Sequence, residues 1–167
     1  MARPDEVGDF WQAFCAARPD LADTDTSYSA WHFCDNPADA DQLADLVAAG
    51  RKRATAGALW SYEAEDEPLP EVGDLSVITD WSGAPRCVIR TTEVEVVPFG
   101  EVTAEFAATE GEGDSSLGYW RAVHERAFTR ELAELNRAFD PAMPVVCERF
   151  EVVFDIESRP GDGPRRG

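Results

Sequence analysis

The chain has 167 residues, of which 44% are hydrophobic, and its 33 acidic and 15 basic residues give a formal net charge of -18. Length and apolar content predict one globular domain with its own core, and no apolar run approaches the roughly 18 residues that span a membrane. The acidity argues against general binding of long double-stranded nucleic acid, because such binding depends on basic contacts to phosphates.

The N-terminal residues indicate the cellular location, and the pattern of cysteines and histidines argues against a metal site. Residues 1–6 lead into a mixed helical pattern rather than an apolar signal core, so a cytoplasmic location is expected. The four cysteines are scattered without a C-x-x-C pair and only two histidines accompany them, at Cys15, Cys34, Cys87, Cys147, His32 and His124. This pattern favours free thiols over a zinc cluster, and we expect neither a metal nor a cofactor.

The first third of the chain predicts two helices. Apolar residues recur at helical spacing over residues 6–18. Asn36 and Pro37 form a typical helix start, and Gly50 is the expected end of that second helix. The basic segment 51–53 therefore follows a helix C-terminus, where cations complement the helix dipole.

The remainder predicts strands, two more helices and a tail. Strands are expected at residues 53–60, 75–79, 86–97 and 145–154. Helices are expected at residues 102–109 and 117–139. Residues 157–167 are rich in Pro, Gly and Arg, and we expect them to be disordered. The pattern is α+β, typical of a small mixed or antiparallel barrel flanked by helices.

Lys52 is the only lysine among the fifteen basic residues, and Thr55 follows three residues later. An ammonium loses pKa on burial and can then act as a base or an acid, whereas a guanidinium stays charged. This favours a chemical role for Lys52. Chance survival in an arginine-biased composition explains the lone lysine about equally well.

Two further segments could contact a ligand. The loop at residues 110–116 contains two glycines, which allow close approach of the backbone, and Ser116 could either contact a ligand or cap the next helix. Trp60 could stack on a base or pack in the core.

Several motifs together resemble those of the ASCH domain family. They are Trp-His-Phe at 31–33, Gly-Arg-Lys-Arg-Ala-Thr-Ala at 50–56 and Glu-Gly-Glu-Gly-Asp-Ser-Ser-Leu-Gly-Tyr-Trp at 110–120. The resemblance implies a small PUA-like β-barrel flanked by helices, related to a fold that binds RNA in modification enzymes. It also implies a domain at 31–156, preceded by a helical extension at 1–30 and followed by the tail.

The resemblance implies an activity and its residues. Some ASCH proteins are amidohydrolases that remove the acetyl group of N4-acetylcytidine with a lysine, a threonine and a glutamate, which match Lys52, Thr55 and Glu110 here. Others are assigned ribonuclease activity, with the same lysine and a serine that would be Ser116. The amidohydrolases carry an arginine soon after the threonine, where this chain has Gly57.

Three functions follow as alternatives: hydrolysis of an acylated nucleoside, non-catalytic binding of a nucleotide or short single-stranded RNA, and ribonuclease action. Substrate contacts are expected from Arg53, Trp60, Arg90, Ser116 and Tyr119. We expect Lys52, Thr55 and Glu110 to converge in one solvent-reachable cleft. Lys52 would be the base that activates the Thr55 hydroxyl as nucleophile, because neighbouring arginines lower its pKa, and a buried Glu110 would be the acid. Residues 52 and 55 fall on opposite faces of a regular strand, so this convergence requires a bulge or turn after Gly50.

Overall fold

The computed structural model describes residues 5–156, which form two compact units. The first unit comprises the chain up to Gly50, Asp74–Arg90 and the segment from Glu151 on, and the second comprises Arg51–Gly73 and Thr91–Phe150. The predicted tail at 157–167 lies outside the described residues. The predicted boundaries at residues 30 and 156 stay a prediction.

The first unit contains α1 (Glu6–Ala17), β1 (Ser29–Trp31), α2 (Pro37–Ala48) and β3 (Leu75–Thr79). It also holds the beginning of β4 (Pro85–Pro98) and the end of β5 (Pro144–Asp155). Its core joins Phe10 and Phe14 of α1 to Phe154, with ring centroids 5.1 and 5.8 Å apart. The helix α2 starts as predicted, because the Asn36 side chain accepts from the backbone N–H of Asp39.

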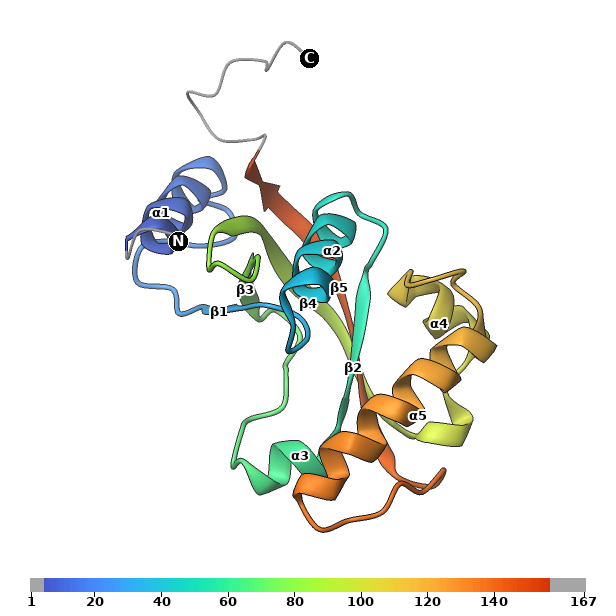
Figure 1. Cartoon of the computed structure of the whole chain (residues 1–167). Coiled ribbons are helices and arrows are strands. Elements are labelled where there is room, and N and C mark those ends of the chain that lie inside the picture. Colours follow the sequence, from blue (N-terminus) through green and yellow to red (C-terminus); the bar gives the residue numbers. More distant parts are fainter. Residues whose placement is uncertain (1–4, 157–167) are drawn as a thin grey trace. The chain divides into compact units, whose positions relative to one another are not determined.

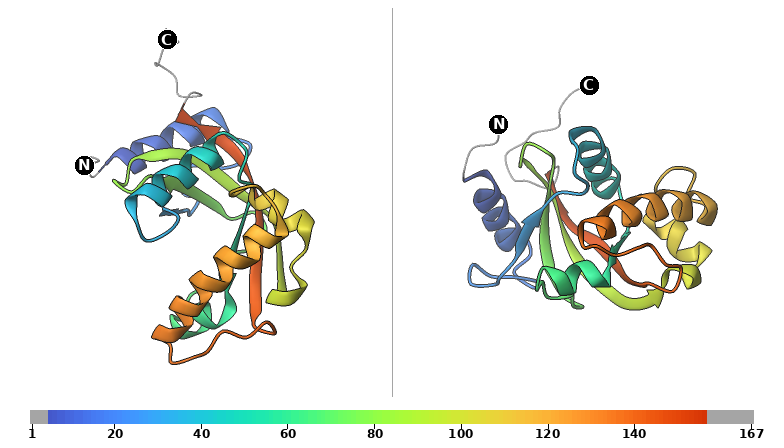
Figure 2. Two further views of the ribbon diagram at one scale, coloured as in Figure 1. Left: turned by 45° about the vertical axis from the view of Figure 1, so that its right-hand side comes forward. Right: turned by 60° about the horizontal axis from the view of Figure 1, so that its bottom comes forward.

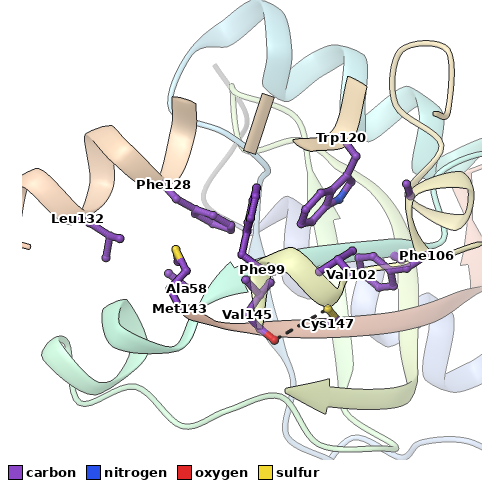
Figure 3. Packing of buried hydrophobic residues seen from close by; sticks show 12 residues of the cluster. Ala58, Phe99, Val102, Phe106, Trp120, Phe128, Leu132, Met143, Val145 and Cys147 are labelled. Atoms are coloured by element: carbon purple, nitrogen blue, oxygen red, sulfur yellow. Dashed lines mark hydrogen bonds between the residues drawn. The ribbon is translucent and has the colours of Figure 1, made fainter. Parts of the chain in front are cut away.

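The second unit contains β2 (Ala54–Ala58), α3 (Leu59–Ala64), the 3-10 turn η1 (Phe99–Glu101), α4 (Ala104–Glu110) and α5 (Leu117–Glu134). Its core lies between the sheet and the helices and is built around Phe99, Trp120 and Phe128 (Figure 3). The helix α4 packs against β2 and α5, and α3 packs against the same two elements (Figure 2).

The strands form one five-stranded sheet in the order β1-β3-β4-β5-β2 (Figure 1). β1 pairs with β3 in parallel, whereas β3 with β4 and β2 with β5 are antiparallel. The mixed sheet with flanking helices confirms the predicted α+β class. Because β2 ends the strand order, its second edge pairs with no other strand of the described residues.

Some predicted bounds are wrong. The strand expected at 53–60 ends at Ala58, where α3 begins. The helix expected to reach 139 ends at Glu134, and Asn136 has a positive φ of 57°. The short strand β1 was not predicted. None of the described helices is long and apolar enough to cross a membrane.

Candidate functional site

Lys52 lies in the short segment that leads into β2, and backbone hydrogen bonds fix this segment on both sides. The N–H of Arg53 donates to Thr109 O at 2.9 Å, and Arg53 O accepts from Phe150 N at 3.0 Å. Since Arg53 O faces β5, the next carbonyl, Ala54 O, points away from β5. The segment therefore joins the end of α4 to the free edge of β2.

The turn after α4 packs its backbone directly against the backbone of Arg51 and Lys52. Gly111 ends α4 in the left-handed region with a φ of 67°. A Cβ at this position would lie 2.2 Å from Arg51 O and 3.4 Å from the Cα of Lys52. Only glycine can occupy this position without a clash. The close packing of the two segments places the neighbouring residues Glu110 and Glu112 beside Lys52.

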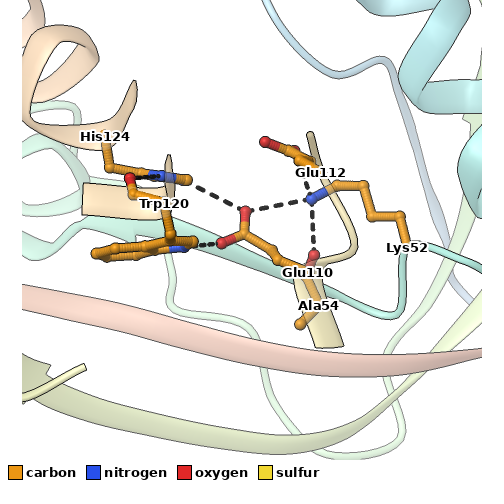
Figure 4. Close-up of polar contacts among 6 residues, drawn as sticks. All are labelled: Lys52, Ala54, Glu110, Glu112, Trp120 and His124. Carbon is orange, nitrogen blue, oxygen red and sulfur yellow. Dashed lines mark hydrogen bonds and ion pairs between the residues drawn. The ribbon is translucent and has the colours of Figure 1, made fainter. Parts of the chain in front are cut away.

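The Lys52 ammonium is buried and surrounded by oxygens (Figure 4). The side chain is 1% exposed, and its Nζ lies 2.8 Å from Ala54 O, 3.2 Å from Glu110 Oε1 and 2.8 Å from Glu112 Oε1. An ammonium has three hydrogens, so these three oxygens suffice to satisfy it.

Glu110, which is 2% exposed, connects Lys52 to α5. Its Oε2 accepts from Trp120 Nε1, and its Oε1 lies 3.3 Å from His124 Nε2. The other ring nitrogen, Nδ1 of His124, lies 2.8 Å from Trp120 O, and the two rings stack with centroids 4.2 Å apart. Because both imidazole nitrogens face oxygens, the protonated imidazole satisfies both contacts.

The pKa values of these groups favour their charged forms. Burial lowers the pKa of Lys52, but the charges of Glu110 and Glu112 outweigh it and the net pKa is raised. Burial raises the pKa of Glu110, but Lys52 and then His124 and Trp120 outweigh it and the net pKa is lowered. Burial lowers the pKa of His124, and Glu110 reverses this. Both pKa shifts are opposite in direction to those expected from the sequence, because carboxylates rather than arginines surround the ammonium. The roles of Lys52 as base and Glu110 as acid stay predictions.

Glu110, Glu112 and His124 also have ligand atoms within 4.8 Å of one another, a spacing that a metal ion could use. The Lys52 ammonium, however, already contacts both carboxylates. The chain thus supplies its own cation to these groups, and we do not identify them as metal ligands.

The structure joins Lys52 to Glu110, as expected, but places Thr55 differently. Thr55 is half-buried on β2 opposite Glu148 of β5. Strand alternation puts its side chain on the face opposite to that of Ala54, which belongs to the core with α4 and α5. The pairing of β2 with β5 is regular from Ala54 to Ala58, without the bulge that would bring Thr55 to the same face as Lys52.

The predicted substrate contacts are dispersed. Arg53 is exposed, and Tyr119 is 41% exposed with its ring against Gly113. Ser116 caps α5, accepting from the N–H of Tyr119 at 3.1 Å. Trp60 packs against the core, with the Arg137 guanidinium 4.4 Å from its ring centre. Arg90 lies on β4 in the first unit, in register with Leu75.

Glu112, Trp120 and His124 were missing from the predicted site. Trp120 and His124 are four residues apart, and this spacing puts them on one face of the helix predicted at 117–139. A histidine and an indole N–H on a buried face need polar partners, and this need was the available signal. For Glu112 the available signal in the sequence is its position between two glycines, Gly111 and Gly113.

A small α+β domain with a buried lysine–glutamate cluster at the start of an edge strand is the class that fold and site define. The family model of the ASCH domain matches residues 29–154. The chain belongs to the ASCH domain family, as its motifs predicted, and has the PUA-like fold, which binds RNA.

Two solved structures are similar over nearly their whole length. An ASCH domain from Lactobacillus crispatus JV V101 is 36% identical with a TM-score of 0.83, and the match covers 91% of this chain and 96% of that one. A protein from Enterococcus faecalis V583 is 34% identical with a TM-score of 0.82, covering 99% of this chain and 100% of that one. Among curated proteins, none matches the chain.

Proposed function

We propose that this ASCH domain binds an N-acylated nucleoside at the Lys52 cluster and hydrolyses its amide bond. The observation that supports the proposal is the buried Lys52 ammonium between Glu110 and Glu112. Apolar residues often stabilise a fold as well as a buried ion pair does. A cluster of four ionisable groups therefore favours a functional role over a purely structural one.

The charge states assign Lys52 the role of an oxyanion donor. An amide carbonyl gains negative charge on its oxygen when it is attacked, and a nearby ammonium stabilises that charge. Glu110 holds the ammonium in place. The reaction adds the elements of water to the amide: the acyl carbon gains an oxygen, the C–N bond breaks, and the products are a carboxylate and the free nucleoside amine.

Thr55 is proposed as a ligand contact at the edge of β2. It follows Ala54, whose carbonyl binds Lys52 Nζ at 2.8 Å, and β2 ends the strand order. A ligand that lies across this edge can reach side chains of both faces. The chemistry of a hydroxyl beside a base would make Thr55 the attacking nucleophile, and Thr55→Ala tests that role by loss of turnover.

The test is turnover of N4-acetylcytidine by the purified protein and two variants. We expect Lys52→Met to lower turnover by about 100-fold or more, the effect of removing one oxyanion donor. Arg51→Met is the matched control, because it removes a neighbouring exposed cation and should retain activity. Equal turnover by Lys52→Met, with folding verified by circular dichroism, would remove Lys52 from the mechanism.

A second candidate function is non-catalytic binding of a nucleotide or short single-stranded RNA. The exposed ring of Tyr119 and the exposed Arg53 favour it, since an aromatic ring can stack on a base while a cation contacts phosphate. Titration of a short single-stranded RNA at low salt tests it, and absence of binding would contradict it. We also propose, from the sequence, that the protein acts in the cytoplasm.

Ribonuclease action has less support, because the hydroxyl of Ser116 caps α5. Cleavage of a labelled oligonucleotide that is lost in a folded Ser116→Ala variant would favour it over both other functions.

A further inference from the structure

We propose that Glu112 occupies the place of the ligand on Lys52, and that its carboxylate swings away when the acyl oxygen of the ligand binds the ammonium. The identity of the ligand rests on the function proposed above, whereas the exchange itself rests on the contacts of Lys52. Glu112 would then be a positioning residue that sets ligand affinity.

The three oxygens around Lys52 Nζ leave no hydrogen of the ammonium for a fourth acceptor. A ligand oxygen that binds Lys52 must therefore replace one of them. Which one it replaces depends on how firmly each oxygen is held.

Two of the three oxygens are fixed. Ala54 O is part of the backbone of β2. Glu110 is 2% exposed and is also bound by Trp120 Nε1 and His124. Moving Glu110 would break these contacts together and leave the buried side chains of Trp120 and His124 without their carboxylate partner.

The third oxygen belongs to Glu112, which can leave most easily. Its side chain is 19% exposed, compared with 2% for Glu110. When it leaves, Lys52 keeps Glu110 as a counter-charge. The loss is then one of two ion pairs of the ammonium, and it is the one whose carboxylate is the more exposed.

Backbone hydrogen bonds hold the chain on both sides of the Glu112 side chain, so the exchange requires only the side chain to move. The N–H of Gly111 donates to Ala107 O at 3.3 Å, and Glu112 O accepts from the N–H of Ser115 at 2.9 Å. The carboxylate oxygen of Glu112 lies 2.8 Å from Nζ, and the oxygen of the ligand's planar acyl group would take this position.

The first experiment measures access to Lys52 without any substrate. An N-hydroxysuccinimide ester of acetic acid acetylates a lysine amine that has lost its proton and releases N-hydroxysuccinimide. This chain has a single lysine, so peptide mass spectrometry gives one rate, which rises when the amine is more accessible and is less held as an ion pair. We expect acetylation at Lys52 to be about tenfold faster in Glu112→Ala than in the unmodified chain. The control Glu95→Ala removes an acid of the same unit that is 60% exposed and should not change the rate. An unchanged rate in Glu112→Ala would overturn the inference.

The second experiment measures binding of N4-acetylcytidine by calorimetry. Affinity should increase about tenfold in Glu112→Ala, whereas loss of a merely structural residue would lower it. If Glu112→Ala does not fold, Glu112→Gln tests the same exchange with the shape retained. Faster acetylation without binding of N4-acetylcytidine supports the exchange and rejects the proposed ligand. Binding that is equal or weaker in a folded Glu112→Ala variant overturns the exchange.

Discussion

At the scale of single residues, the charge on Lys52 decides the chemistry of the site. Glu110 and Glu112 outweigh burial and keep its pKa raised. An ammonium that stays charged donates hydrogen bonds and cannot accept a proton. In the proposed reaction Lys52 therefore suits stabilisation of an oxyanion, and a group other than Lys52 would act as the general base.

Removing Glu110 should destabilise the protein more than removing an exposed acid. Glu110→Gln leaves the buried ammonium and the imidazolium short of a counter-charge, and we expect the free energy of unfolding to fall by about 3 kcal/mol. The control is Glu105→Gln, whose side chain is 83% exposed and pairs with Arg149, with an expected loss under about 1 kcal/mol. Urea denaturation measures both, and equal losses would contradict the importance of the buried pair.

Acid should remove the contribution of Glu110. Burial raises the pKa of Glu110, but Lys52, His124 and Trp120 together outweigh it and lower the pKa from 4.5 to about 2. A lowered carboxyl pKa contributes stability above the unfolded value of 4.5, which is lost as the pH falls towards 2. The stability difference between the unmodified chain and Glu110→Gln should therefore shrink below about pH 4.5 in urea titrations. A difference that is constant down to about pH 3 would contradict this.

The sequence revealed half of the candidate site. Lys52 stands out by composition, and Glu110 stands out through the motif that contains it. Neither Trp120 nor His124 could be connected to them, because the connection depends on how α5 packs beside the end of α4. The nearest charges in sequence, Arg51 and Arg53, gave the wrong sign for the pKa shift of Lys52, since both side chains are exposed.

At the scale of elements, prediction succeeded where local signals are strong. The Asn36 and Pro37 start of α2 and the alternating strand that became β4 depend on neighbours in the sequence. The missed elements depend on tertiary contacts. β1 has three residues and forms because it pairs with β3, and α3 begins directly at the end of β2 without a side-chain cap.

Two glycines in the α4–α5 region should respond oppositely to alanine. Gly111→Ala places a Cβ 2.2 Å from Arg51 O at a φ of 67°, so we expect a loss of more than about 1 kcal/mol. Gly118→Ala, near the start of α5 with nothing within 4 Å, should gain about 0.5 kcal/mol through helix propensity. Thermal unfolding of the two variants tests the pair. An unchanged stability of Gly111→Ala would mean that the turn after α4 does not pack closely against the segment that holds Lys52.

At the scale of the whole molecule, the charge of -18 limits the partners. A polyanion meets repulsion everywhere except near local cations such as Arg53. A neutral nucleoside meets no such repulsion, and at the Lys52 cluster the charge of the ammonium is balanced by the carboxylates of Glu110 and Glu112. The overall charge thus favours a small neutral ligand over long RNA.

Salt should distinguish the two kinds of ligand. Affinity for N4-acetylcytidine should stay constant between about 50 and 200 mM salt, because the binding of a neutral ligand releases no condensed counterions. Binding of a short single-stranded RNA, if Arg53 contacts its phosphates, should weaken over the same range, and Arg53→Gln should reduce the slope of log affinity against log salt by roughly 0.7. Fluorescence and calorimetric titrations measure the two ligands. Steep salt dependence for the nucleoside would contradict a balanced site and would favour a phosphate-bearing ligand.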